Sequence, residues 1–82
     1  MHDSATMLSL MHKIEQLARS QEARRVTAIR VRLGALSHMS PQHFREHFDA
    51  ASRGSIADGA AVDAQQTPDL FGVFLVDVEL ET

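Results

Sequence analysis

Hydrophobic residues near the start of the chain recur at spacings of three and four residues, with polar residues between them. This period places the hydrophobic side chains on one face of a helix, so it predicts an amphipathic helix over residues 4–21. Asp3 or Ser4 is expected to cap it, because a short side-chain oxygen can accept from the unpaired amides of a first turn. The first three residues would then lie just outside the helix. The expected buried stripe is Met7, Leu10, Met11, Ile14, Leu17 and Ala18.

Residues 25–33 instead alternate hydrophobic and polar positions, which is the period of a strand with one buried face. Gly34 closes this strand. The inward side chains are expected to be Ile29, Val31 and Leu33, with Arg30 and Arg32 outward. A second clear strand is predicted over 73–81, and a short, weaker one over 60–66. In the strand over 73–81 the expected inward residues are Phe74, Val76, Val78 and Leu80, and the expected outward residues are Asp77, Glu79 and Glu81.

A second helix is predicted over residues 41–53. Ser40 followed by Pro41 favours a helix start, because proline at the first helical position lacks only an amide that would be unpaired anyway. Gly54 favours the stop, since glycine readily adopts the left-handed conformation that ends many helices. Its hydrophobic stripe is expected to be Phe44, Phe48 and Ala51.

The predicted order α-β-α-β-β indicates an α+β fold with two layers, in which both helices cover one face of a three-stranded mixed sheet. The 82 residues suffice for one domain, 1–82, with a modest core. So small a sheet has exposed edges, and an edge strand can pair with a second copy of the chain, so a homo-oligomer is an open alternative.

Composition narrows the classes of function. A net charge of −3 without tryptophan or tyrosine argues against a nucleic-acid surface. No hydrophobic stretch approaches the length of a membrane span, and no export signal is evident, so the expected location is the cytoplasm. The chain has no cysteine, which excludes zinc sites built on thiolates. Any metal ion must therefore be bound by nitrogen and oxygen ligands.

Half of the lysines and arginines lie within nine residues, at Arg24, Arg25, Arg30 and Arg32. Such a cluster can bind phosphate groups, and a nucleic-acid binder would need Arg30 and Arg32 to be unpaired. The acidic outward positions of the strand over 73–81 offer the simpler alternative. If the two strands are neighbours, opposite charges pair across the sheet and the cluster is compensated.

The first three residues, "MHD", carry the most specific candidate chemistry. The terminal amine of Met1, the amide nitrogen of His2 and the imidazole of His2 can bind one ion through a five-membered and a six-membered chelate ring. Asp3 can add its amide or carboxylate. Such a nitrogen-rich tetragonal set suits Ni(II) or Cu(II). By itself, however, a histidine at position 2 more often belongs to a disordered terminus.

The other histidines give weaker signals. His43 and His47 are spaced four residues apart and could share a metal ion, but ordinary surface or packing roles are favoured, with rings that could edge the core. His38 would be an extra ligand only if the fold brings it beside Met1, and His12 is assigned no role. Ser37 next to His38 is mere proximity in sequence and does not make an activated nucleophile. The chain is therefore expected not to be an enzyme.

Several longer motifs point to a family. The chain starts with "MH" and an acidic residue, and an expected amphipathic helix follows. The next segments are "RRVTAIRVRLGALSHMSP" and "FREHFDAASRGSIADGAAVD". Together these segments resemble the HypA/HybF family, the nickel metallochaperones of NiFe-hydrogenase maturation. The resemblance runs from Met1 to about Thr67, and "ELET" resembles the closing strand. Its most specific part is "LGALSHMSP" followed by Phe44, Phe48 and "RGSIADGA".

This resemblance implies a nickel site at the residues matching Met1, His2 and Asp3, and as partners a HypB-type GTPase and the hydrogenase large subunit. The chain departs from the family in two ways. A short "TPDLFG" turn, near 67–72, stands where the family carries a four-cysteine zinc domain, so no zinc is expected. Position 3 is aspartate where the family usually has glutamate. The alternative is an interaction module for hydrogenase assembly that uses no metal.

Overall fold

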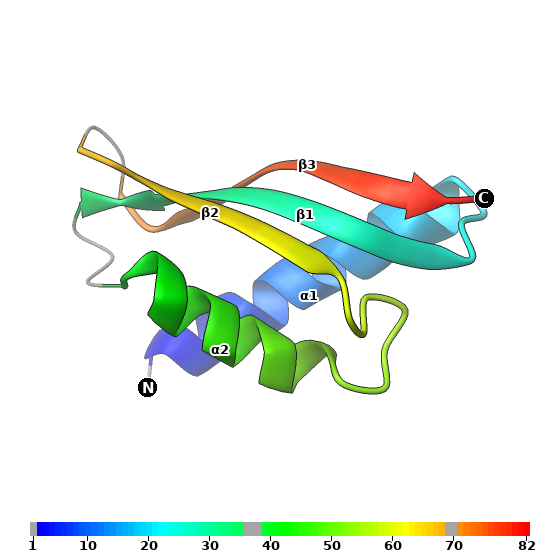
Figure 1. Cartoon of the computed structure of the whole chain (residues 1–82), viewed down its shortest axis with the longest axis horizontal. Coiled ribbons are helices and arrows are strands. Elements are labelled where there is room, and N and C mark those ends of the chain that lie inside the picture. Colours follow the sequence, from blue (N-terminus) through cyan, green and yellow to red (C-terminus); the bar gives the residue numbers. More distant parts are fainter. Residues whose placement is uncertain (1, 36–38, 69–70) are drawn as a thin grey trace.

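The structure is a computed structural model that describes residues 2–35, 39–68 and 71–82, with the backbone alone for residues 2–5. Both helices lie on the same face of one sheet (Figure 1). This arrangement confirms the predicted two-layer α+β fold and the predicted order of elements. In sequence order the elements are α1 (His2–Ser20), β1 (Arg25–Gly34), α2 (Pro41–Ser52), β2 (Ala61–Thr67) and β3 (Val73–Glu81).

The three-stranded sheet has the order β2-β1-β3, so β1 is the central strand. β2 runs parallel to β1 and β3 runs antiparallel to it, which confirms a mixed sheet. The chain therefore passes around the end of β1 on its way from β2 to β3, and there the Gly34 amide donates to the Gly72 carbonyl at 2.7 Å. Of the turn predicted near 67–72, Asp69 and Leu70 lie outside the described residues.

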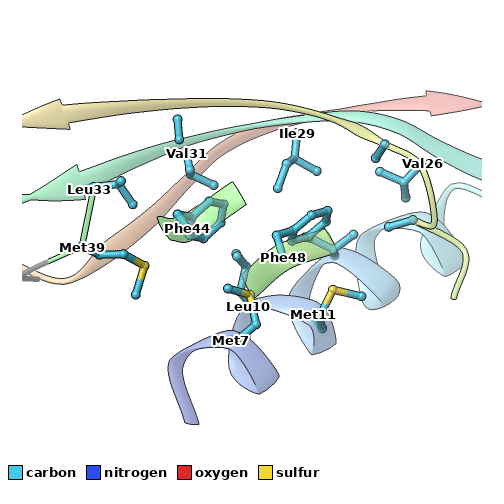
Figure 2. Close-up of a cluster of buried hydrophobic side chains, with 14 of the residues drawn as sticks. Met7, Leu10, Met11, Val26, Ile29, Val31, Leu33, Met39, Phe44 and Phe48 are labelled. Atoms are coloured by element: carbon cyan, nitrogen blue, oxygen red, sulfur yellow. The ribbon is translucent and has the colours of Figure 1, made fainter. Parts of the chain in front are cut away.

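The core lies between the sheet and the helices, and two phenylalanines of α2 occupy its centre (Figure 2). Phe44 and Phe48 are fully buried, and their rings stack with centroids 6.1 Å apart, within the range of favourable aromatic pairs. α1 contributes its methionines and leucine from one side, and β1 contributes branched side chains from the other. The buried hydrophobic residues of these two elements are Met7, Leu10, Met11, Ile14, Ala18, Val26, Ile29, Val31 and Leu33.

The ends of α2 follow the predicted signals. The Ser40 hydroxyl accepts from the His43 amide at 3.0 Å, so Ser40 is the N-cap and Pro41 begins the helix. Gly54 takes a φ of +79°, the left-handed conformation expected after a helix. The helix ends at Ser52, one residue before the prediction.

The structure corrects three details of the helices. α1 begins at His2, so His2 and Asp3 belong to its first turn and not to a segment before it. Leu17 is 43% exposed, because it lies at the margin of the buried stripe. On α2 the prediction of Ala51 as a buried residue is wrong. Ser52 is buried instead, because it follows Phe48 by four residues on the same helical face, and its hydroxyl bonds to the Asp49 carbonyl at 3.4 Å.

The predicted inward face of β3 is correct in only one half of the strand. Val78 and Leu80 pack against the core as expected, but Phe74 and Val76 are exposed. In the ladder with β1, Arg30 pairs with Asp77 whereas the next β1 residue, Val31, pairs with Leu75. The extra residue in β3 forms a bulge that reverses the alternation. The inward residues before the bulge are therefore Val73 and Leu75.

Candidate metal centre

The predicted metal site lies at the first turn of α1. The first four amides of an α-helix have no acceptor within the helix, and they point out of its end. Because α1 begins at His2, the amides of His2 and Asp3 belong to this unpaired set. Met1 and His38 lie outside the described residues, as do the side chains of His2 and Asp3. The structure therefore gives the backbone setting of the site.

Helical backbone suits chelation by consecutive nitrogens. With a helical ψ of about −42°, the nitrogens of two successive residues lie about 2.8 Å apart. Two nitrogens bound at right angles to one ion, each about 2.0–2.1 Å from it, lie about 2.8–3.0 Å apart. The helical conformation of His2 thus spaces its own amide nitrogen and that of Asp3 as two adjacent ligands would be spaced.

Within the ranges 2–35, 39–68 and 71–82, no group of three or more His, Cys, Asp or Glu residues could hold an ion. His12 is exposed on α1. α1 and α2 begin at the same end of the long axis of the molecule (Figure 1).

His43 and His47 are brought together on α2. Both residues are exposed, so their rings do not edge the core. The rings stack with centroids 4.5 Å apart, and the two Nε2 atoms are 2.9 Å apart. The spacing of four residues was a usable signal in the sequence, but the contact between the two nitrogens depends on side-chain rotamers that a sequence does not give.

The arginine cluster is compensated where β1 lies between its two neighbours. The Arg30 side chain reaches Asp63 on β2 and Asp77 on β3, each at 3.3 Å. Arg25 lies 4.0 Å from Glu81. The strands are neighbours, and the predicted pairing of opposite charges across the sheet is thus confirmed for Arg30 and Arg25. The condition for a nucleic-acid surface, with Arg30 unpaired, is not met.

We expect Arg30→Gln to lower the free energy of unfolding by about 1 kcal/mol at low salt, because half-exposed ion pairs contribute about 0.2–1 kcal/mol each. The loss should shrink at high salt, which screens exposed charges. Urea denaturation followed by circular dichroism measures both values. Arg32→Gln is the control, because no carboxylate of the described residues lies within 4.0 Å of Arg32. Equal, salt-independent losses in the two variants would contradict the pairing.

Neither helix, over the residues that the structure describes, is both long and hydrophobic enough to cross a lipid bilayer.

Comparison with known proteins assigns the chain to a family. Residues 1–71 match the family model described as hydrogenase/urease nickel incorporation, metallochaperone, hypA. The chain is 44% identical over 63 residues to the hydrogenase maturation factor HypA of Methylocella silvestris, covering 77% of this chain and 56% of that protein. It is 37% identical over 68 residues to the HypA of Rhodopseudomonas palustris strain TIE-1, covering 83% and 60%. The chain thus spans less than two thirds of the length of these relatives.

The fold itself is also found in a solved structure. The solution structure of the Ni metallochaperone HypA from Helicobacter pylori superposes with a TM-score of 0.67, covering 93% of this chain and 83% of that one. The sequence identity is 18%, so this likeness supports the fold alone.

Proposed function

The chain belongs to the HypA family of nickel-incorporation metallochaperones, and from this premise we propose that it carries Ni(II) as cargo on a free N-terminus during assembly of a NiFe-hydrogenase. The proposed ligands are the amine of Met1, the amide and imidazole of His2, and the amide or carboxylate of Asp3. His38 is a further candidate. The matched relatives are maturation factors, and we assign this chain no catalytic step.

The observation that carries the proposal is the start of α1 at His2. An amide in the first turn of a helix can lose its proton to a metal ion without breaking a helical hydrogen bond. The partial positive charge at a helix N-terminus also favours the resulting anionic nitrogen. Two deprotonated amides would balance the charge of one Ni(II). The terminus is therefore suited to nitrogen ligation of the tetragonal kind that Ni(II) prefers.

The cargo must then pass to other proteins. By the family resemblance we propose a HypB-type GTPase and the hydrogenase large subunit as partners, in the cytoplasm. In this proposal residues 1–82 act as one nickel-binding domain, with the segment 67–72 in the place of a zinc domain.

Titration with Ni(II) tests the proposal on protein with an authentic, unextended terminus. We expect His2→Ala to remove one equivalent of tightly bound Ni(II), because it deletes the imidazole and with it the six-membered chelate ring. His12→Ala is the matched control, since His12 is an exposed histidine of the same helix. Equal stoichiometry and affinity in the unchanged protein and His2→Ala would refute the proposal.

A second function, docking without metal, is favoured by one observation. Phe74 and Val76 of the edge strand β3 are 44% and 43% exposed, and Phe71 just before the strand is 70% exposed. Hydrophobic side chains beside an open edge are suited to binding another protein. Co-purification with a hydrogenase large subunit that His2→Ala leaves unchanged, together with an absence of nickel binding, would favour this function over the first.

A further inference from the structure

We propose that His43 and His47 form a second metal-binding site, a two-imidazole clip on the exposed face of α2 that takes a divalent first-row ion in tetragonal geometry, Ni(II) or Cu(II). This site shares no residue with the proposed N-terminal site. The proposal for this second site can therefore be tested independently of the proposed function.

The separation of the two ring nitrogens carries the proposal. The Nε2 atoms of His43 and His47 are 2.9 Å apart. Two nitrogens about 2.0–2.1 Å from one ion lie about 2.8–3.0 Å apart when they bind at a right angle, and about 3.3–3.4 Å apart in a tetrahedral site. The observed separation fits the right angle. Right-angle nitrogen ligands are typical of Ni(II) and Cu(II), whereas Zn(II) in structural sites prefers the tetrahedral arrangement.

The same contact is also a hydrogen bond, in which one Nε2–H donates to the other Nε2. Binding of an ion requires the donor ring to carry its proton on Nδ1 instead, so that both Nε2 lone pairs face the ion. This is a change of tautomer and needs no movement of the backbone. Two histidines four residues apart on one helix are a known metal-binding arrangement, used in zinc proteases.

The helix that carries the pair is held rigidly. Phe44 and Phe48 directly follow the two histidines in sequence, and both are fully buried in the core. They fix α2 against the sheet, so the two imidazoles are presented to solvent at a set spacing. A preorganised pair of ligands loses less conformational freedom on binding than a flexible pair does.

Two protein nitrogens do not complete the coordination of a tetragonal ion. The remaining positions go to water or to donors of another molecule. A site of this kind releases its ion readily, which distinguishes it from a closed structural site. We therefore assign to the clip short-lived binding of an ion in exchange with solvent or with a partner.

The test uses the full chain with the terminal site disabled, by His2→Ala combined with one added residue before Met1. Ni(II) and, separately, Cu(II) are titrated into this protein. We expect one equivalent to bind, and His43→Gln or His47→Gln to weaken binding at least tenfold, since loss of one ligand removes the chelate. In proton NMR spectra, the first portions of metal should perturb the ring signals of His43 and His47 together.

Two controls separate chelation from general histidine binding. His12→Gln should leave the affinity unchanged, because no histidine lies three or four residues from His12 on α1. Arg45→His combined with His47→Gln keeps the number of histidines but moves one to a position two residues from His43, where helical side chains do not meet. This variant should bind as weakly as His47→Gln. Equal affinity in all variants, or ring signals that do not respond to metal, would overturn the clip.

Discussion

Phe48→Ala is expected to lower the free energy of unfolding by about 3–5 kcal/mol, the usual cost of emptying a buried phenylalanine site. Phe48 is fully buried and stacks on Phe44 between α1 and the sheet (Figure 2). At roughly 0.05–0.15 kcal/mol per residue, a chain of 82 residues has about 4–12 kcal/mol in total. The substitution should therefore remove about a quarter of this stability or more.

Urea denaturation followed by circular dichroism measures this loss, because the chain has no tryptophan or tyrosine for a fluorescence signal. Phe74→Ala is the matched control, since it makes the same chemical change at a side chain that is 44% exposed on the outer face of β3. We expect it to cost less than about 1 kcal/mol. Equal losses in the two variants would contradict the described core.

Blocking the terminal amine is expected to have the largest effect on metal binding. Acetylation of the amine removes this terminal ligand. Without a free amine on Met1, the five-membered ring between this amine and the His2 amide cannot close, so Ni(II) affinity at this site should fall by about a hundredfold or more. Isothermal titration of the blocked and unblocked proteins measures the change.

The block leaves the core untouched, so the two proteins should unfold at the same urea concentration without metal. This result would show that the loss of affinity is local. Unchanged nickel affinity after acetylation would contradict a site built on the terminal amine.

Local signals were sufficient to predict most of the fold. For α2, a capping serine before proline and a glycine after the last turn fixed both ends to within one residue. For β1, hydrophobic residues alternate with arginines, and the buried face followed directly. These signals act within a few residues, so they can be interpreted without knowledge of the tertiary structure.

The face of β3 could not be predicted in the same way. Residues 73–76 are all hydrophobic, so the pattern there does not distinguish the two faces. The choice is made by the bulge at Val76, which depends on the register with β1 and thus on contacts distant in sequence. The start of α1 at His2 was also not predicted, because the residue types at this position fit two interpretations. Asp3 and Ser4 suit a helix cap, but acidic and hydroxyl residues are also stable in a first turn.

The candidate sites also differ in whether they depend on neighbours in the sequence or on contacts made by the fold. The terminal chelate could be proposed from the sequence, because its ligands are neighbours in the chain. The clip on α2 was visible only as a spacing, and the structure adds the 2.9 Å separation that gives this spacing a chemical meaning. For Arg30 the sequence left two alternatives, and its carboxylate neighbours on β2 and β3 show that it is paired.

The central claim is that the amino terminus binds Ni(II) through nitrogen ligands in a plane. Absorption and NMR spectra of His43→Gln/His47→Gln protein loaded with one equivalent of Ni(II) test it most directly, because square-planar Ni(II) is diamagnetic whereas six-coordinate Ni(II) is paramagnetic. We predict a diamagnetic complex with a visible absorption band, which disappears when the terminal amine is acetylated. A paramagnetic complex, or a spectrum that acetylation leaves unchanged, would contradict the account.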